Sequence, residues 1–470
     1  METLSSYLTE RDKQIQLPEN SEVRRIQHGI ERVMKVITES VKTKDSRLIG
    51  KIIPVGSFYS DLKIGLPDEF DFIYELQTLE EGIDFELMPS GFKGTRNLWR
   101  TPNGDPGKRK VLLKNPAMYS RDFDELNPDE WLHRVGRGRQ LHDHEYVLHP
   151  VGVKNSFYNA ISEALKELNQ SKLPKYLSVD MSEECTFFYG PAITLFFKWN
   201  GRFYKNLSIS VDLTVALKAM EWESQFDFMR SNNVAPDSFL RKILIEEISQ
   251  HGYHLVPSIS DRGHIQWKIS TSFLETRALA RFPRNSAIKQ VIRVIKTVKD
   301  EHLKYRPNLD LMRDQSVANV LKFLRFYFPR DYDDNHHHLV SSYLIKTSVF
   351  TLCAFATLSE WQKASLSGLF MLTLVFLCKT IANGTLMNFF ISSQKLKIPE
   401  HGDILPGFYR IFHEIDDKLR ENKIFPADTV TEYDLDKMDR EPFSNHAVFT
   451  IFHITMKHLD EHFGNLWTPE

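Results

Sequence analysis

Apolar residues recur at helical spacing near the start of the chain and predict one long helix over residues 21–42. They are separated by three or four positions, and most of the positions between them are polar or charged. The apolar set consists of Val23, Ile26, Ile30, Val33, Ile37 and Val41. This spacing places one apolar stripe along an amphipathic helix. Pro18, Asn20 and Ser21 are residue types that commonly precede or start a helix.

Two other segments alternate between apolar and polar residues and predict β-strands over residues 66–77 and 204–217. Alternate residues of a strand share one face of the sheet. The apolar faces would hold Phe70, Phe72, Tyr74 and Leu76 in the first strand and Leu207, Ile209, Val211, Leu213 and Val215 in the second. The polar faces would hold Glu69 and Asp71 in the first strand and Ser208, Ser210, Asp212 and Thr214 in the second.

The second half of the chain is dominated by helical patterns. The predicted helices cover residues 238–251, 272–281, 287–302, 316–328, 341–358, 364–382 and 406–421. Residues 90–142 are rich in Gly, Pro, Arg and Lys with weak periodicity, which is typical of loops or short strands. We therefore predict a mixed α/β protein of two lobes: a long helix and an α/β core in residues 1–225, and a helical lobe in residues 226–470.

Composition and charge narrow the class of protein. The chain has 470 residues, of which 41% are hydrophobic and 26% are charged, as expected of a folded globular protein. The net charge of −2 gives no global support for nucleic-acid binding, so only a local basic patch would serve that purpose. The most apolar segment, residues 369–378, is about ten residues long, half of what a membrane helix needs, and predicts a buried helix.

The three cysteines, Cys185, Cys353 and Cys378, are far apart in the sequence. They are too few for a disulfide framework, and no Cys-x-x-Cys pair indicates a zinc site. The first residues contain no basic stretch followed by an apolar core, so we expect no secretory signal. These features predict a reducing, cytoplasmic setting.

Three carboxylates raise the question of chemistry. Glu69 and Asp71 share the polar face of one predicted strand, and Asp212 lies on the polar face of the other. Two carboxylates ~4 Å apart repel by about 4 kcal/mol at an effective dielectric near 20, so a converging cluster would require cations. Oxygen ligands of this kind suit Mg²⁺ or Mn²⁺. The alternative is that the acids simply form the solvated face of a sheet.

A Gly-Ser turn, an acidic pair on one strand and a later acid on another form, in this order, the signature of polymerase-β-type nucleotidyltransferases. The segment GSFYSDLKIGLPDEFDFIYEL at residues 56–76 resembles the active-site segment of cyclic GMP-AMP synthase and of its animal relatives, the cGAS-like receptors. The male-abnormal-type developmental proteins share the wider fold. The resemblance continues in GPAITL at 190–195, SVDLTVAL at 210–217, WKISTSFLE at 267–275, VIRVIKTVKDEHL at 291–303 and LVSSYLIKT at 339–347.

The resemblance implies a role for each matching residue. Glu69, Asp71 and Asp212 would hold two Mg²⁺ or Mn²⁺ ions and carry catalysis. The donor nucleotide would be held by Gly56, Ser57, Lys296, Ser342, Tyr343 and Lys346, with Tyr343 stacking on a base. The acceptor side would be lined by Lys268, Ser270, Ser272 and Glu275; relatives often have Arg where Lys268 stands.

The chain departs from vertebrate cyclic GMP-AMP synthase where that enzyme carries a zinc thumb. Residues 276–295 contain no Cys or His, so we expect no structural zinc. Because the thumb contributes to the grip on DNA, its absence favours another activator, and the resemblance points to double-stranded RNA. The triplet at residues 336–338, His-His-His, is interpreted as a solvated loop, with metal binding as the alternative.

A duplex partner would require a basic surface. Candidates on the first predicted helix are Arg24, Arg25, Arg32, Lys35, Lys42, Lys44 and Arg47, interleaved with acids. A second grouping comprises Lys93, Arg96, Arg100, Lys108, Arg109, Lys110 and Lys114, to which Arg134, Arg137 and Arg139 are close in sequence.

These features together predict an enzyme that joins ATP and GTP into a cyclic dinucleotide, with release of pyrophosphate, when it senses a ligand in innate immunity. The resemblance further implies that the activator orders the loop at residues 58–66. Two alternatives stay open at this point: a catalytically silent scaffold or developmental protein of the same fold, and a synthase of linear oligonucleotides.

Overall fold

The computed structural model describes residues 2–89, 107–114, 132–135, 145–168, 173–180, 190–220, 238–258, 266–302, 340–354, 366–382, 388–391 and 411. The chain forms two compact units. The sheet unit comprises Gln16–Phe228 and Lys242–Pro283, and the helical unit comprises Met1–Ile15, Met229–Arg241 and Arg284–Glu470. The boundary predicted at residue 225 lies close to one of the points where the chain passes between units, and the sequence pattern did not indicate the others.

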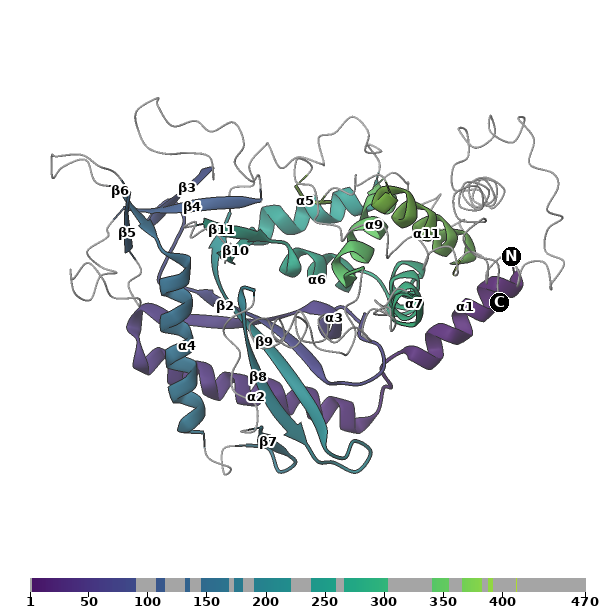
Figure 1. Cartoon of the computed structure of the whole chain (residues 1–470), viewed down its shortest axis with the longest axis horizontal. Coiled ribbons are helices and arrows are strands. Elements are labelled where there is room, and N and C mark those ends of the chain that lie inside the picture. Colours follow the sequence, from purple (N-terminus) through teal and green to yellow (C-terminus); the bar gives the residue numbers. More distant parts are fainter. Residues whose placement is uncertain are drawn as a thin grey trace, which may run out of the picture. The chain divides into compact units, whose positions relative to one another are not determined.

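The described strands all belong to the sheet unit and form one mixed sheet (Figure 1). They are β1 (Gly50–Val55), β2 (Glu69–Leu76), β3 (Phe85–Pro89), β4 (Lys108–Leu113), β5 (Leu132–Val135), β6 (Glu145–Leu148), β7 (Leu177–Val179), β8 (Ala192–Trp199), β9 (Leu207–Ala219), β10 (Tyr253–Ser258) and β11 (Gln266–Ser270). Their order is β1-β2-β9-β10-β11-β4-β6-β5, while β3 pairs with β4, and β8 pairs with β7 and β9. The predicted mixed α/β class is confirmed.

The parallel pair β2 and β9 lies at the centre of the candidate site. Phe70, Phe72, Tyr74 and Leu76 of β2 are buried, as are Ile209, Val211, Leu213 and Val215 of β9. The polar residues between them are more accessible: Glu69 is exposed, and Asp71 and Asp212 are partly exposed. The predicted alternation is confirmed at the start of β2 and over residues 207–215 of β9, but Ile73 and Glu75, on the predicted polar face of β2, are buried as well.

Three helices position the strands that carry the site. Helix α2 (Ser21–Lys44) begins where the side chain of its N-cap residue, Asn20, accepts hydrogen bonds from two backbone N–H groups. Its apolar stripe is buried, and it packs on α4 (Pro150–Lys166), whose Phe157 stacks on Tyr74 of β2 at 4.8 Å between ring centroids. The short helix α3 (Gly56–Tyr59) packs on β2 and on α6 (Ser272–Ala280).

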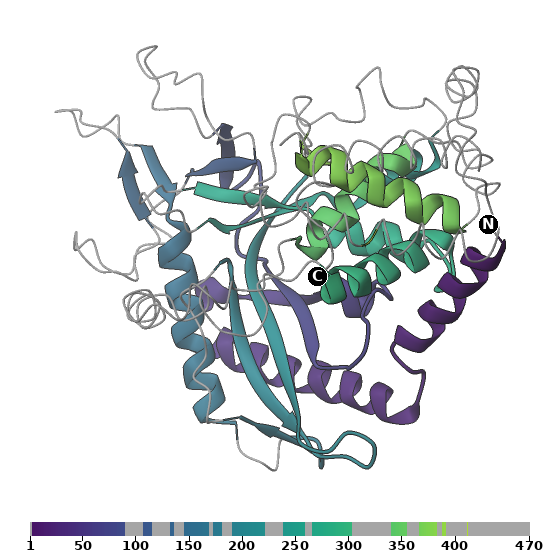
Figure 2. The same cartoon turned by 45° about the vertical axis from the view of Figure 1, so that its right-hand side comes forward.

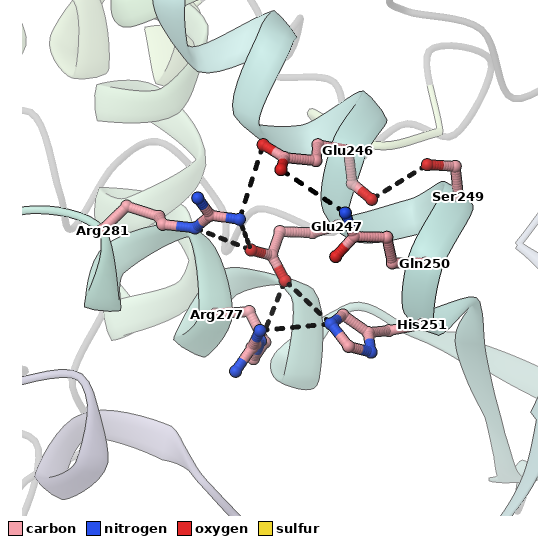
Figure 3. Close-up of polar contacts among 7 residues, drawn as sticks. All are labelled: Glu246, Glu247, Ser249, Gln250, His251, Arg277 and Arg281. Atoms are coloured by element: carbon pink, nitrogen blue, oxygen red, sulfur yellow. Dashed lines mark hydrogen bonds and ion pairs between the residues drawn. The ribbon is translucent and has the colours of Figure 1, made fainter.

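Helix α6 is joined to α5 (Phe239–His251) by a clamp of charged residues (Figure 3). The side chain of Glu247 is fully buried and accepts hydrogen bonds from Arg277 Nε at 2.9 Å and from Arg281 Nη2 at 2.7 Å. Burial alone would raise the pKa of Glu247, but the hydrogen bonds from the two arginines lower it below its ordinary value. The clamp therefore keeps a buried carboxylate ionised and fixes α6 against α5.

The helical unit contains α1 (Glu2–Ile15), α7 (Ala287–His302), α9 (Ser342–Ala354) and α11 (Leu366–Ala382), which pack on one another (Figure 2). Arg293 of α7 and Asp12 of α1 form a fully buried ion pair with N–O distances of 2.7 and 2.8 Å. Helix α11 contains the most apolar segment of the chain, and its buried residues confirm the prediction of a buried helix. In the described part of the chain, no helix combines the length and the apolar character needed to cross a membrane.

Most predicted helices in the described ranges are found with small shifts at their ends. Residues 238–251, 272–281, 287–302 and 364–382 correspond to α5, α6, α7 and α11, and α9 is the described part of the helix predicted at 341–358. The helices predicted at 316–328 and 406–421 lie outside the described residues, except for residue 411. Helices α1 and α4 were not predicted.

Candidate active site

Two carboxylates lie side by side on neighbouring strands. Asp71 of β2 is the register partner of Asp212 of β9 in the parallel pairing. Adjacent strands are ~4.8 Å apart, so the two residues leave the sheet next to each other. Thr194 of β8 donates a hydrogen bond from Oγ1 to Asp212 Oδ1 at 2.6 Å, which orients that carboxylate. The sheet thus presents two oxygen-rich side chains at one point of its polar face.

The turn that follows β1 packs closely against the side chain of Asp71. Gly56 has a φ of +85°, and a Cβ atom at this position would collide with the carboxylate of Asp71. Its N–H donates to Thr276 Oγ1 of α6 at 3.1 Å. Only glycine both adopts this backbone conformation at little cost and leaves room for the carboxylate. The pairing of Val55 with Asp71 between β1 and β2 brings the turn to this place.

The third predicted ligand, Glu69, is held by a lysine. Lys63 Nζ lies 2.8 Å from Glu69 Oε2 and 2.8 Å from Asp68 Oδ1, and the Lys63 side chain is only 12% exposed. Burial alone would lower the pKa of Lys63, but attraction to Glu69 and hydrogen bonds to both acids raise it above its ordinary value. The lysine is therefore a fixed positive charge beside the acidic pair.

The donor atoms of the three acids suit a divalent metal ion, but the positions of their side chains suit it less well. Carboxylate oxygens are the donors that Mg²⁺ and Mn²⁺ prefer, and Asp71 and Asp212 are adjacent. Among the residues that the structure describes, however, no three Asp, Glu, His or Cys side chains are gathered closely enough to hold a metal ion. The side chain of Glu69 is directed to Lys63 instead.

Aromatic packing supports the Gly-Ser turn and links it to α2. The ring of Phe58 lies 4.4 Å from that of Phe70, and the ring of Tyr59 lies 5.6 Å from that of Phe72. The hydroxyl of Tyr59 donates to Glu31 Oε1 of α2 at 3.2 Å. Burial, followed by the nearby Glu31, raises the pKa of Tyr59, which therefore stays a hydrogen-bond donor. A chain of direct contacts thus connects the solvent-facing helix α2 with the turn.

The predicted acceptor-side residues lie on β11 and the start of α6. Lys268 is exposed, whereas Ser270 and Ser272 are partly buried. Glu275 is 2% exposed and accepts a hydrogen bond from Thr271 Oγ1 at 2.8 Å. Thr276, one residue further along α6, bonds to Gly56 and was not singled out from the sequence. No local pattern marks it, because the bond spans 220 positions.

The remaining predicted donor-side residues belong to the helical unit. Lys296 lies on α7, and Ser342, Tyr343 and Lys346 lie on the first turns of α9; all four are partly exposed. Lys346 Nζ is 6.0 Å from the centroid of the Tyr343 ring. The structure thus brings Tyr343 and Lys346 together on one helix face, as their spacing of three positions requires.

The predicted basic face of α2 is present but partly neutralised. Arg24, Arg25 and Lys35 are exposed, and Lys42 is partly exposed. Arg25 pairs with Glu22 at 3.8 Å and Lys42 with Glu39 at 2.7 Å. In the second basic grouping Arg109 is only 2% exposed, so it is not available to a partner. Lys93, Arg96, Arg100, Arg137, Arg139, the side chain of Arg134 and the triplet His336, His337 and His338 lie outside what the structure describes.

Comparison with protein families decides the assignment. A model of the Mab-21 protein nucleotidyltransferase domain matches residues 58–280, and a model of the Mab-21 protein HhH/H2TH-like domain matches residues 313–397. The chain belongs to the cGAS-like/Mab-21 family. The predicted resemblance is confirmed. The matched nucleotidyltransferase region contains Glu69, Asp71, Asp212 and residues 268–275, whereas Gly56 and Ser57 lie immediately before it.

Membership of the Mab-21 family sets the class of activity. A nucleotidyltransferase domain supports a transferase that uses nucleoside triphosphates, and such domains generally use divalent metal ions. The Mab-21 family also includes developmental members. The product, the activator and the biological role therefore belong to the proposal below.

Proposed function

We propose that this protein is a cytoplasmic sensor enzyme that joins ATP and GTP into a cyclic dinucleotide of the cyclic GMP-AMP type in innate immunity. The observation that carries the proposal is the pairing of Asp71 with Asp212 directly beneath the Gly56 turn. A scaffold protein has no need for the three predicted metal ligands Glu69, Asp71 and Asp212. Activation by double-stranded RNA is part of the proposal.

Each of the two steps would be a phosphoryl-group substitution. A ribose hydroxyl attacks the α-phosphorus of a nucleoside triphosphate, the new P–O bond forms, and the bond to the pyrophosphate leaving group breaks. Glu69, Asp71 and Asp212 would hold two Mg²⁺ or Mn²⁺ ions, which when bound lower the pKa of the attacking hydroxyl and stabilise the developing charge. Asp212, oriented by Thr194, would help to remove the hydroxyl proton.

The family resemblance indicates the residues that would hold the nucleotides. Gly56 and Ser57 would bind the donor triphosphate, together with the cationic Lys296 and Lys346. Ser342 would support the same phosphates and Tyr343 would stack on a base. The acceptor would contact Lys268, Ser270, Ser272 and Glu275. Thr276 is a positioning residue in this scheme, because it fixes the backbone of Gly56.

Double-stranded RNA would bind the exposed face of α2 through its phosphates and its shape. The proposed contacts are Arg24, Arg25, Lys35 and Lys42. The hydrogen bond between Tyr59 and Glu31 supplies a direct connection from this helix to the Gly-Ser turn. A shift of α2 on binding would therefore move the loop at residues 58–66, which contains Lys63.

A second candidate function is that of a catalytically silent member of the same family. The observation that favours it is the contact between Lys63 and Glu69, in which an ammonium group pairs with a carboxylate that is predicted to bind a metal ion. In the first proposal this contact belongs to a resting state and is broken on activation. In the second it is permanent.

The decisive experiment is product analysis of the purified chain. It would be incubated with labelled ATP, GTP, CTP and UTP, with Mg²⁺ or Mn²⁺, and with double-stranded RNA, double-stranded DNA or neither. A cyclic product resists phosphatase, whereas a linear oligonucleotide loses its terminal phosphates. Asp71→Asn and Asp212→Asn should each abolish the product, and Asp61→Asn should retain activity, because asparagine tolerates the positive φ of residue 61. A phosphatase-sensitive product, or residual activity in Asp212→Asn above about a thousandth of the parent, contradicts the proposal.

The activator requires a separate test. Charge reversal at Arg24, Arg25 and Lys35 should weaken duplex binding and activation without changing the affinity of the protein for Mn²⁺. Lys242→Glu, a single charge reversal at an exposed position of α5, is the control for each single reversal on α2. Duplex binding should weaken with salt by about 0.7–0.9 log units per phosphate contact for each tenfold rise. Full activity without nucleic acid would exclude the duplex activator and leave the catalytic proposal intact.

A further inference from the structure

A basic and aromatic surface lies at the end of α2 where that helix begins. It is formed by the loop between β8 and β9 and by the segment before β7, which lie beside α2 in both views (Figures 1 and 2). We call it the basic-aromatic tip. It consists of Lys175, Tyr176, Arg202, Phe203 and Lys205, all of which are exposed.

The loop of the tip is anchored from beneath by a buried carboxylate. Glu22 of α2 has no exposed surface and accepts hydrogen bonds from Trp199 Nε1 at 2.9 Å and from the backbone N–H groups of Phe203 and Tyr204 at 2.9 and 3.2 Å. Burial alone would raise the pKa of Glu22, but these hydrogen bonds and Arg25 lower it, so the carboxylate stays charged. Gly201 is required here, because a Cβ would collide with the same carboxylate.

The aromatic rings of the tip face outward although the loop is fixed. Phe203 is 65% exposed, which is unusual for a large apolar side chain on a rigid loop, and Tyr176 is 37% exposed. The backbone of Tyr176 is held by Asn200, whose N–H donates to its carbonyl oxygen at 2.9 Å, and its ring packs against Trp199 at 5.7 Å. Each ring is therefore held in place before any partner binds, and part of its surface is open to solvent.

Cations flank both rings. The guanidinium of Arg202 lies 5.7 Å from the centroid of the Phe203 ring. Lys175 Nζ and the guanidinium of Arg25 lie 5.5 and 5.8 Å from the centroid of the Tyr176 ring. The acid beneath the loop, Glu22 of α2, is turned inward and hydrogen-bonded. The outer surface thus combines positive charge with accessible π faces.

We propose that the basic-aromatic tip binds unpaired nucleotides of a nucleic acid. Phe203 stacks on a base, and Lys175, Arg202 and Lys205 contact the flanking phosphates. Stacking of a base on an aromatic side chain tolerates any sequence, because every base has a π face. This site goes beyond the proposed function and does not rest on catalysis; of the proposed duplex contacts of α2, only Arg25 lies against the tip.

An anionic membrane is the competing partner for such a surface, and the observations favour nucleic acid. Membrane anchoring depends on the apolar area inserted, and the tip offers one largely exposed phenylalanine ring for insertion. Even a myristoyl chain gives marginal, reversible binding. The second ring, Tyr176, is 37% exposed, packs on Trp199 and is flanked by cations. A stacked base and its flanking phosphates use Phe203 and the three cationic side chains of the tip.

Binding would be measured by fluorescence anisotropy on the full chain, with a labelled uridine oligoribonucleotide of roughly ten nucleotides, a length within the usual footprint of single-strand sites. Phe203→Ala should weaken binding about tenfold and leave the salt dependence unchanged. The double variant Arg202→Ala, Lys205→Ala should flatten the slope of log affinity against log salt by about 1.4, at 0.7 per phosphate contact. Ile83→Ala removes a residue that is 63% exposed elsewhere on the sheet unit and should bind as the parent does.

The outcomes separate this inference from the proposed activator. Equal binding of the oligonucleotide by the parent and Phe203→Ala, or an unchanged salt slope in the double variant, overturns the tip site. Binding of phosphatidylserine vesicles that depends on Phe203, without oligonucleotide binding, assigns the tip to membranes and also overturns it. Charge reversal at Lys35 and Lys42 should leave oligonucleotide binding intact while weakening the binding of blunt duplex RNA. Because the tip variants fold around an unchanged Glu22, their circular dichroism and Tm should match the parent.

Discussion

The ammonium nitrogen of Lys63 lies 2.8 Å from the carboxylate of Glu69, two residues before the Asp71 carboxylate on the same strand face. A lysine at this distance supplies one of the positive charges that a divalent ion would supply. Lys63 belongs to the loop between the Gly-Ser turn and β2, so any movement of that loop changes the electrostatics of the acidic residues. In the proposed enzyme, metal binding and loop position are therefore coupled.

The first prediction follows from this contact. Lys63→Met keeps most of the apolar stem and removes the charge, which leaves Glu69 without its cation. The affinity of the protein for Mn²⁺, measured by titration calorimetry or electron paramagnetic resonance, should rise about tenfold, a change of 1.4 kcal/mol. Lys51→Met removes a lysine that pairs with Glu75 instead, and should leave Mn²⁺ binding unchanged. Unchanged or weaker Mn²⁺ binding in Lys63→Met would mean that the lysine does not compete with the metal.

The second prediction compares two glycines that both have positive φ. Gly56→Ala places a methyl group into the carboxylate of Asp71, whereas Gly65→Ala, at φ +72°, meets nothing within 4 Å. Both variants carry the strain of the backbone conformation, about 1–2 kcal/mol. Only Gly56→Ala should also displace Asp71 and lose transferase activity by at least a hundredfold. Similar activities of the two variants, at matched Tm, would show that the turn does not position the carboxylate.

The third prediction concerns the link between α2 and the turn. Tyr59→Phe removes the hydroxyl that donates to Glu31 and keeps the ring that packs on Phe72. Basal Mn²⁺ binding and duplex affinity should be retained, while stimulation by duplex RNA should fall severalfold. Tyr204→Phe, a similar change at a partly exposed position, is the control. If Tyr59→Phe is stimulated as strongly as the parent, the coupling runs through other contacts.

Local periodicity explains which features could be predicted. A strand repeats every two residues and a helix every 3.6, so the faces of β2, β9, α2 and α7 can be derived from the order of residues alone. Helix α1 escaped prediction because only Leu4 and Leu8 of its described side chains are buried apolar residues, too few to mark a stripe. The buried ion pair between Asp12 and Arg293 joins positions 281 apart, and no local pattern encodes it.

The candidate site likewise combines features that local spacing predicts with features that depend on contacts between distant parts of the sequence. That Glu69 and Asp71 share a face was derived from their spacing, and the same alternation placed Asp212 on the polar face of a second strand; the family resemblance then implied that the three act together. The register that places Asp71 beside Asp212 depends on the pairing of two distant strands, and the contact of Lys63 with Glu69 depends on the path of a loop. The catalytic and binding roles of all these residues stay predictions. Their arrangement nevertheless determines which substitutions test them most directly.

The fourth prediction concerns the clamp shown in Figure 3. Glu247→Gln replaces a buried carboxylate that two arginines share, and leaves both guanidinium groups short of a counter-charge. Removing one partner of a buried pair typically costs about 3–5 kcal/mol; since the arginines are over 40% exposed, we expect about 2 kcal/mol here. Glu246→Gln, the exposed neighbour that pairs with Arg281 at 3.5 Å, should cost less than about 0.5 kcal/mol. Equal losses of unfolding free energy in the two variants, measured by urea denaturation, would show that Glu247 contributes no more to stability than Glu246 does.

The last prediction concerns the stability of the fold at low pH. Glu75 of β2 is 7% exposed and accepts contacts from His254 Nε2 at 2.9 Å and Lys51 Nζ at 2.8 Å. Burial alone would raise the pKa of Glu75, but these partners lower it to about 2, from an ordinary value of 4.5. Because the pKa is lower in the folded state, the carboxylate stabilises the fold fully above pH 4.5, and this contribution disappears as the pH falls toward 2.

A difference of about 2.5 pKa units corresponds to about 3 kcal/mol, of which about 2 kcal/mol should be lost between roughly pH 6 and pH 3. Urea denaturation of the parent and of Glu75→Gln at these two pH values isolates the effect, since the other carboxylates titrate alike in both proteins. The free-energy difference between the two should be largest at pH 6 and shrink toward pH 3. A difference that is constant, or that grows in acid, would show that Glu75 is not held ionised by His254 and Lys51.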